Sequence, residues 1–244
     1  MDTFEAPARQ LTTQEFLDSV LQLHPQIAAF DCDGTMWSGD AGETFFDWEL
    51  RRGLVSPEAA RSVRQRYAAY KAGKVSEDDM CAELVTMHRG LPESRLMQAA
   101  GEFFDHFFPG QIFPEMRQLV NSLQQNGCEV WAVSSSNEWV IRAGMKHLGI
   151  PEDRILATAV QLDDGIITDR IIRVPSGPGK PQALREVVNK RVDAAFGNSR
   201  WDTEMLEMAK TAFAVNPNAD LESEARRRGW SIYFPDGTAP RAAS

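Results

Sequence analysis

An apolar segment close to the N-terminus ends in two acidic residues and a glycine, and it restricts the fold more than any other feature. Ile27–Phe30 runs directly into Asp31-Cys32-Asp33-Gly34-Thr35. Side chains on a strand alternate between faces, so Asp31 and Asp33 are expected on one side, at the edge where open α/β sheets bind ligands. Two carboxylates this close repel each other unless a divalent cation is present. With such a cation, one carboxylate is free to act as a nucleophile and the other as a proton donor.

The second half of the chain alternates between strand and helix patterns. The residues 155–174 lack helical periodicity and break at Asp163-Asp164-Gly165, which predicts a hairpin. Repeated strand, helix, strand units predict an α/β fold with a doubly wound parallel sheet and helices on both faces. The remaining strands are predicted at 129–133, 192–196, 211–215 and 230–234, and a disordered tail is predicted at 235–244.

Residues 38–108 contain four helical patterns and no convincing strand. Glycines separate these patterns, and Ser56-Pro57 and Ser76-Glu77 are typical helix starts. We therefore predict an α/β core domain formed by 1–37 and 109–244, with an inserted all-helical cap domain at 38–108 that acts as a lid.

Composition excludes several classes of protein. The 244 residues are 43% hydrophobic, as in an ordinary globular protein, and their formal net charge of −9 argues against nucleic-acid binding. No apolar run approaches the length of a membrane span. Three widely spaced cysteines indicate neither disulfides nor a zinc site and favour the cytoplasm. We expect no membrane or nucleic-acid partner, and the sequence makes no prediction of oligomeric state.

The run from Asp31 to Thr35 resembles the first motif, Asp-x-Asp-Gly-Thr, of the haloacid dehalogenase-like hydrolase superfamily. The resemblance implies a Rossmann-like core. It also implies that Asp31 attacks phosphorus and that Asp33 serves as general acid and base. Taken alone, the same residues are also compatible with an acidic surface turn.

Three later positions resemble the other motifs of this superfamily. Ser134 and the backbone N–H of Ser135 would bind a phosphate oxygen, although a serine after a strand is also a common helix N-cap. Lys180 would neutralise charge on the nucleophile and on the phosphoryl group; the alternative is a surface lysine at a helix start. Asn198 and Asp202 occupy the fourth motif, in which Asn198 replaces the usual first acid.

The resemblance also implies a Mg²⁺ cofactor. Its ligands would be a carboxylate oxygen of Asp31, the backbone oxygen of Asp33 and the side-chain oxygen of Asn198, with Asp202 close by through water. The amide in place of an acid is expected to weaken the binding of the metal.

The helical insertion and the hairpin resemble the phosphoserine phosphatase-like branch of the superfamily. In that branch an acid after the nucleophile contacts the substrate amine, a role that Asp40 or Glu43 would take here; both are equally compatible with first-turn helix acids. Trp37, Phe45 and Trp48 are interpreted either as core residues or as an aromatic wall for a quaternary ammonium group.

These observations predict a Mg²⁺-dependent phosphomonoesterase that hydrolyses a small phosphorylated metabolite through an aspartyl-phosphate intermediate. One alternative is a catalytically weakened protein that binds a phosphate ligand in the same pocket, which the replacement at Asn198 suggests. A 2-haloacid dehalogenase of the same fold is disfavoured, because Asp33 is a proton donor that phosphate esters need.

Overall fold

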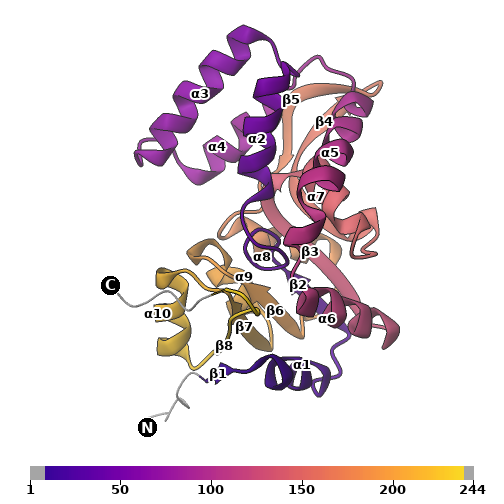
Figure 1. Ribbon diagram of the computed structural model, residues 1–244, viewed down its shortest axis with the longest axis vertical. Coiled ribbons are helices and arrows are strands. Elements are labelled where there is room, and N and C mark those ends of the chain that lie inside the picture. The colour runs from indigo at the N-terminus through magenta and orange to yellow at the C-terminus, as the bar shows by residue number, and fades with distance from the viewer. Residues whose placement is uncertain (1–8, 239–244) are drawn as a thin grey trace.

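One sheet organises the lower part of the molecule and extends into its upper part (Figure 1). The computed structural model describes residues 9–238. The strand order is β1-β8-β7-β6-β2-β3-β4-β5, and every neighbouring pair is parallel except the β4–β5 hairpin. The strands are β1 (Gln10–Leu11), β2 (Ile27–Phe30), β3 (Glu129–Asn137), β4 (Ile155–Asp163), β5 (Ile166–Arg173), β6 (Ala194–Gly197), β7 (Thr211–Val215) and β8 (Ser231–Tyr233).

Helices cover both faces of the sheet. The central strand β2 shows why: Ala28 and Phe30 pack into one apolar cluster, whereas Ile27 and Ala29 pack into another on the opposite face. The first face is covered by α1 (Thr13–Leu21), α6 (Pro114–Gln125) and α7 (Glu138–Lys146), and the second by α8 (Gly179–Val187), α9 (Thr203–Met208) and α10 (Ala219–Arg228). The predicted doubly wound α/β core is confirmed.

Four helices lie between β2 and α6, as the sequence predicts, and they form the upper part of Figure 1 together with the hairpin. Ser56 and Ser76 cap two of them by accepting a backbone hydrogen bond from the third residue of the helix. The four helices are α2 (Ala41–Arg52), α3 (Pro57–Lys71), α4 (Glu77–Thr86) and α5 (Glu93–Phe107). Short 3₁₀ turns occur at Pro109–Gln111, Glu152–Arg154 and Arg200–Asp202.

The four helices differ in how they are anchored. The helices α2 and α5 pack against α7, and their buried Phe45 and Phe103 belong to the main apolar cluster of the sheet. The helices α3 and α4 bury Val63 and Met80 in a small cluster with part of α2. The helix α4 also contributes Val85 to the main cluster and packs against β3, β4 and β5. The tip of the β4–β5 hairpin is joined to the segment between α4 and α5 by backbone hydrogen bonds, including Gly90 N–H to Ile167 O at 2.8 Å.

Local differences from the sequence predictions have physical causes. The strand β3 continues to Asn137 instead of ending at Val133, because Asn137 still pairs with Thr158 of β4 after an irregular register. The two-residue strand β1, which pairs with β8, is too short to produce a sequence pattern. Trp37 and Phe45 are fully buried core residues, so no wall for an ammonium group is formed by them.

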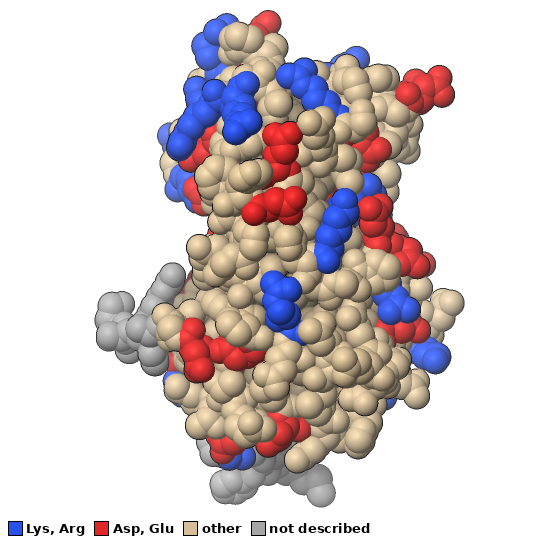
Figure 2. All heavy atoms as spheres, turned by 45° about the vertical axis from the view of Figure 1, so that its right-hand side comes forward, with Lys and Arg blue, Asp and Glu red and all other residues tan. Residues whose placement is uncertain are grey.

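Two further predictions concern the tail and the membrane. Of the tail predicted at 235–244, residues 239–244 lie outside the described part. No helix within residues 9–238 is long and apolar enough to cross a bilayer. Figure 2 shows basic and acidic side chains interspersed over the face that it presents.

Candidate active site

Three neighbouring strands end at one cavity. The strand β2 lies between β3 and β6, and all three run in parallel, so their carboxyl ends meet at one edge of the sheet. Asp31, Ser134 and Asn198 occupy these ends, and Lys180 comes from the first turn of α8. All four line a cavity of about 400 Å³. The sheet topology therefore brings together residues that lie up to 167 positions apart in the chain (198 minus 31).

A buried ion-pair network lies at the base of this cavity. The ammonium of Lys180 donates to Asp31 Oδ1 at 2.7 Å, to Asp202 Oδ1 at 2.5 Å and to the backbone oxygen of Val133 at 3.2 Å. The lysine is 2% exposed, Asp202 0% and Asp31 6%. The second oxygen of Asp31 accepts a hydrogen bond from Thr35 Oγ1 at 2.7 Å. The orientation of the Asp31 carboxylate is thus fixed from both sides.

The pKa values in this network follow from burial and from the neighbouring charges. Burial raises the pKa of Asp31 to about 6; the charge of Asp202 adds to the rise and Lys180 opposes it. Burial acts against the charge of Lys180, but Asp202 and Asp31 outweigh it and raise the pKa of the ammonium above its usual value. Lys180 is therefore a permanent cation beside Asp31, which excludes the surface-lysine interpretation.

Asp33 lies in a different environment on the same edge. Its Oδ1 accepts hydrogen bonds from Trp37 Nε1 at 2.8 Å and from the Ala41 N–H at 2.6 Å, and its Oδ2 accepts one from Ser136 Oγ at 2.7 Å. Burial raises the pKa of Asp33 to about 7, and the charge of Asp40 contributes to the rise. A carboxyl group with a pKa near neutrality is suited to giving and taking a proton at physiological pH.

The end of β3 forms the wall opposite the carboxylates. Ser134 is buried, and its hydroxyl accepts the Ser136 N–H at 3.1 Å, whereas the helix N-cap at this point is Asn137, which accepts the Val140 N–H. Ser134 is therefore not the cap of α7. Thr158 Oγ1 donates to the backbone oxygen of Ser135 at 2.7 Å and fixes the backbone of this segment.

The side chains of Asn198 and Asp202, which belong to the fourth motif, have different surroundings. One oxygen of Asp202 is bonded to Lys180, and the other accepts the N–H groups of Asn198 and Ser199 at 2.9 Å each. The side chain of Asn198 lies against Gly34, lines the cavity and makes no hydrogen bond with a described residue. The structure thus places Asn198 toward the cavity and Asp202 toward Lys180.

The donor atoms around the cavity are hard oxygens. No group of three or more His, Cys, Asp and Glu side chains that could hold a metal occurs within residues 9–238. Asp31 and Asn198 offer a carboxylate and an unbonded amide to one cavity that Asp33 also lines. Oxygen donors of this kind suit Mg²⁺ rather than a transition metal, so the residues fit the predicted ion in donor type.

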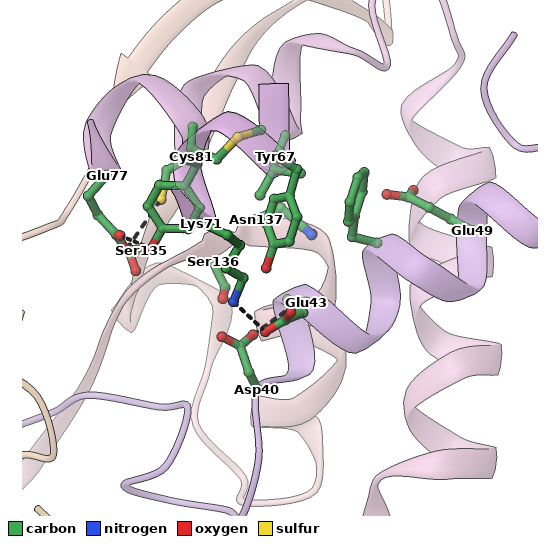
Figure 3. Close-up of a pocket in the computed structure, with 15 residues that line it drawn as sticks. Asp40, Glu43, Glu49, Tyr67, Lys71, Glu77, Cys81, Ser135, Ser136 and Asn137 are labelled. Atoms are coloured by element: carbon green, nitrogen blue, oxygen red, sulfur yellow. Dashed lines mark hydrogen bonds and ion pairs between the residues drawn. The ribbon is translucent and has the colours of Figure 1, made fainter. Parts of the chain in front are cut away.

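A smaller cavity of about 80 Å³ adjoins the first, between the helical insertion and the end of β3. Figure 3 shows Asp40 and Glu43 from the start of α2, together with Tyr67 and Glu77, around the same space as the serines of β3. Asp40 is also the N-cap of α2, because it accepts the Glu43 N–H at 2.7 Å. Both predicted specificity residues therefore line a cavity that adjoins the one lined by Asp31 and Lys180.

A family model supports the superfamily resemblance. The model described as haloacid dehalogenase-like hydrolase matches residues 28–207, which is most of the chain. The chain belongs to this family. The curated relatives of this haloacid dehalogenase-like hydrolase include a histidinol-phosphatase of Neisseria meningitidis serogroup C, 27% identical over 84% of this chain and 97% of that protein. A phosphoserine phosphatase of Mycobacterium tuberculosis is also 27% identical, over 84% of this chain and 69% of that protein.

Solved structures support the fold of this haloacid dehalogenase-like hydrolase. A Bordetella pertussis protein of unknown function has a TM-score of 0.73 at 21% identity, covering 85% of this chain and 97% of that one. A phosphoserine phosphohydrolase-like protein of Francisella tularensis has a TM-score of 0.57 at 19% identity, covering 84% and 94%. The predicted enzyme class, a phosphoric monoester hydrolase of this superfamily, is confirmed at the level of the family and its phosphatase relatives.

Sequence reasoning missed several residues of this hydrolase site. Ser136 and Trp37 hold the Asp33 carboxylate, and Asn216 Nδ2 donates to the backbone oxygen of Gly34 at 3.0 Å. Tyr70 and Glu77 line both cavities. Ser136 carried a signal, since it belongs to the polar run that ends β3, and Trp37 lies only four residues after Asp33. Asn216, Tyr70 and Glu77 depend on contacts between distant elements.

Proposed function

We propose that this hydrolase is a Mg²⁺-dependent phosphomonoesterase that acts through an aspartyl-phosphate intermediate. The observation that carries the proposal is the buried Lys180 ammonium, shared by Asp31 at 2.7 Å and Asp202 at 2.5 Å at the base of the cavity. It keeps Asp31 ionised in a buried position and presents positive charge to an incoming phosphoryl group. The mechanism assigns the nucleophile to Asp31 and the proton transfers to Asp33.

The first step transfers the phosphoryl group to the protein. A carboxylate oxygen of Asp31 attacks phosphorus, the bond from phosphorus to the ester oxygen breaks, and Asp33 gives its proton to the departing oxygen. In the second step Asp33 takes a proton from water, whose oxygen attacks the same phosphorus. Inorganic phosphate leaves and Asp31 is regenerated. A pKa of about 7 lets Asp33 serve in both directions.

The non-bridging oxygens of the phosphoryl group are bound by the wall of the cavity. The Ser134 hydroxyl, the Ser135 N–H and Lys180 are the proposed donors, since all three residues line the cavity from the end of β3 and the start of α8. Asp202 acts through Lys180, which it holds in place, and its closeness to the metal through water stays a prediction.

Mg²⁺ would be held by Asp31, by the backbone oxygen of Asp33 and by the amide oxygen of Asn198. When bound, the ion neutralises charge on the phosphoryl group and on Asp31. Asn198 lacks a hydrogen-bonding partner among the described residues, which supports this role. We assign the cap to residues 38–108, because α2, α3 and α4 contribute residues to the smaller cavity.

The proposed substrate is a small phosphorylated metabolite. The names of the relatives from N. meningitidis and M. tuberculosis specify histidinol phosphate and phosphoserine, which are both small phosphorylated metabolites and support the proposal. The cavity of about 400 Å³ lies at the small end of the range for ligand sites.

The test is turnover of an aryl phosphate by the Asp31→Asn variant in the presence of Mg²⁺. We expect loss of at least about 10³-fold in kcat, since the covalent step is abolished, with the near-UV circular dichroism of the folded protein retained. Asp18→Asn, an exposed site on α1, is the matched control and should keep full activity. Undiminished turnover by Asp31→Asn, or by the parent in excess chelator, would contradict the proposal. Phosphate binding without turnover of any ester would favour the weakened binding protein instead.

A further inference from the structure

The two cavities are adjacent and meet at a boundary of shared lining residues. Asp40, Tyr70, Glu77, Ser135 and Ser136 line both the larger cavity and the smaller one. The phosphate donors lie on the side of the larger cavity. A group attached to the phosphate therefore extends past Asp40 and Glu77 into the space of about 80 Å³. This space has room for a small leaving group only.

The acids around the smaller cavity are not equivalent. Glu43 is paired with Lys71 at 3.2 Å, and the buried Glu49 is paired with His88 at 2.7 Å. Asp40 and Glu77 take part in no ion pair with any residue in the described range 9–238. The two carboxylates on the shared boundary are thus the ones that form no direct ion pair within the described range.

Cations that would bind a carboxylate group of a substrate are missing from the lining. No described arginine lines either cavity, and the lysines are Lys71, which is paired with Glu43, and Lys180, which is enclosed by Asp31 and Asp202. An anionic leaving group would therefore meet Asp40 and Glu77, and only the Lys71 ammonium, already paired with Glu43, would offset the repulsion.

The aromatic residues of the lining also favour a cationic group. Tyr70 donates a hydrogen bond to Glu77, which fixes the position of that carboxylate on the boundary. Tyr67 lies next to Tyr70, with ring centroids 5.7 Å apart, and already has the Lys71 ammonium 5.2 Å from its ring centre. Tyrosine rings and carboxylates together are a favourable environment for an ammonium group.

We propose that the smaller cavity selects phosphate esters of small amino alcohols, in which the leaving group carries a protonated amine and no carboxylate. Asp40 and Glu77 bind the amine, and Glu43 is a structural partner of Lys71. This inference rests on the proposed phosphatase activity. Of the two specificity residues predicted from the sequence, it keeps Asp40 and leaves out Glu43, and it adds Glu77 from α4.

The test compares kcat/KM for three esters of similar size: phosphoethanolamine, 2-hydroxyethyl phosphate and phosphoserine. 2-Hydroxyethyl phosphate has a hydroxyl where phosphoethanolamine has its ammonium group. Phosphoserine has the ammonium group and an additional carboxylate. We expect kcat/KM for phosphoethanolamine to exceed that for each of the other esters by about tenfold or more. A hydrogen bond to a charged group in a partly buried site contributes about this factor.

Two variants locate the preference. Asp40→Asn keeps an acceptor for the cap of α2, and Glu77→Gln keeps an acceptor for Tyr70, so both remove charge with little change of shape. In each variant the ratio of kcat/KM for phosphoethanolamine over 2-hydroxyethyl phosphate should fall several-fold. The matched control Asp78→Asn removes the exposed charge next to Glu77, outside both cavities, and should leave the ratio unchanged.

The outcomes separate this inference from the phosphatase activity on which it rests. If an aryl phosphate is turned over and phosphoethanolamine is no better than 2-hydroxyethyl phosphate, the inference is wrong and the activity stands. If phosphoserine is preferred to phosphoethanolamine, the inference is also wrong. If no ester, the aryl phosphate included, is turned over with any divalent metal, both are wrong.

Discussion

Two groups of acidic residues in this protein differ in how their charge is balanced. At the edge of the sheet, Asp31 and Asp202 share the buried ammonium of Lys180. At the start of α2 and α4, Asp40 and Glu77 have no ion pair with a described residue. The first group is enclosed and fixed by hydrogen bonds from several elements; the second lines a cavity and is only partly surrounded.

The difference shows how one cavity serves two purposes. Paired charges in a buried site give a defined geometry, because removal of any partner leaves a buried charge uncompensated. Unpaired charges at a cavity boundary are stabilised when a ligand supplies the missing partner. Under the proposed function, the sheet edge carries out the reaction and the helical boundary selects the substrate. Four changes test this comparison.

Removal of the central cation should have the largest effect. Lys180→Met leaves Asp31 and Asp202 facing each other in a buried site, and we expect a loss of about 3–5 kcal/mol in the free energy of unfolding, measured by urea denaturation. Turnover should fall by at least about 10²–10³-fold. The matched control Lys210→Met breaks an exposed pair with Asp193 and should cost less than about 1 kcal/mol. Equal effects of the two variants would contradict the comparison.

Gly42→Ala disturbs Ser136, which lines both cavities and so lies between the two groups of acids. A Cβ at this position would lie 2.4 Å from Ser136 Oγ, the donor that holds Asp33. Displacement of the Ser136 hydroxyl is expected to cost about 1–3 kcal/mol of stability and to lower kcat with it. In the control Gly101→Ala, within α5, the new methyl group meets nothing within 4 Å, so the variant should be slightly more stable than the parent. A stable, fully active Gly42→Ala protein would show that the contact is unimportant.

Asn198→Asp restores the acid that the family pattern has at this position. The added negative charge faces the cavity, so the Mg²⁺ concentration for half-maximal activity should fall about tenfold, in line with the stronger attraction of a carboxylate for the ion. A titration of activity with Mg²⁺ measures this. Asn121→Asp on the exposed surface of α6 is the control and should leave the titration unchanged. An unchanged titration for Asn198→Asp would remove Asn198 from the metal site.

The pH dependence of stability tests the burial of the Asp33 carboxyl group. The folded-state pKa of Asp33 is raised to about 7, above the value of 3.8 for an unperturbed aspartate. Protonation therefore favours the folded state, and the stability contribution present below about pH 4 is lost as the pH rises toward about 7. Relative to Asp33→Asn, the metal-free parent should lose up to about 4 kcal/mol between these pH values, because each unit of pKa shift corresponds to about 1.4 kcal/mol. Urea denaturation in chelator measures it, and a constant difference between the two proteins would contradict the assignment.

The sequence predicted the fold from local patterns, and it predicted the residues of the candidate site from those patterns together with the family resemblance. Apolar strands ending in polar residues, such as Asp31, Ser134 and Asn198, report their position at a sheet edge directly. Strand β1 and the full length of β3 could not be predicted, since they depend on pairing with β8 and β4.

The boundary between the two cavities could be predicted only in part, for a similar reason. Asp40 follows the first motif closely, so its place near the site could be inferred. Glu77 and Tyr70 reach the same boundary through the packing of α3 and α4, with nothing in their local sequence to indicate it. The pairing of Glu43 with Lys71, 28 residues away, also depends on tertiary structure.

The hydrogen bonds between the hairpin tip and the loop from Gly90 to Glu93 restrict how substrate enters. The insertion is joined to the rest of the chain by its two covalent ends, by the packing of α2 and α5 against α7 and of α4 against β3 and β4, and at this tip by hydrogen bonds. A body held at so many separate points cannot swing as a rigid door about a line through two of them. We therefore expect any opening of the insertion to involve α3, whose buried Val63 lies in the small apolar cluster rather than in the main one.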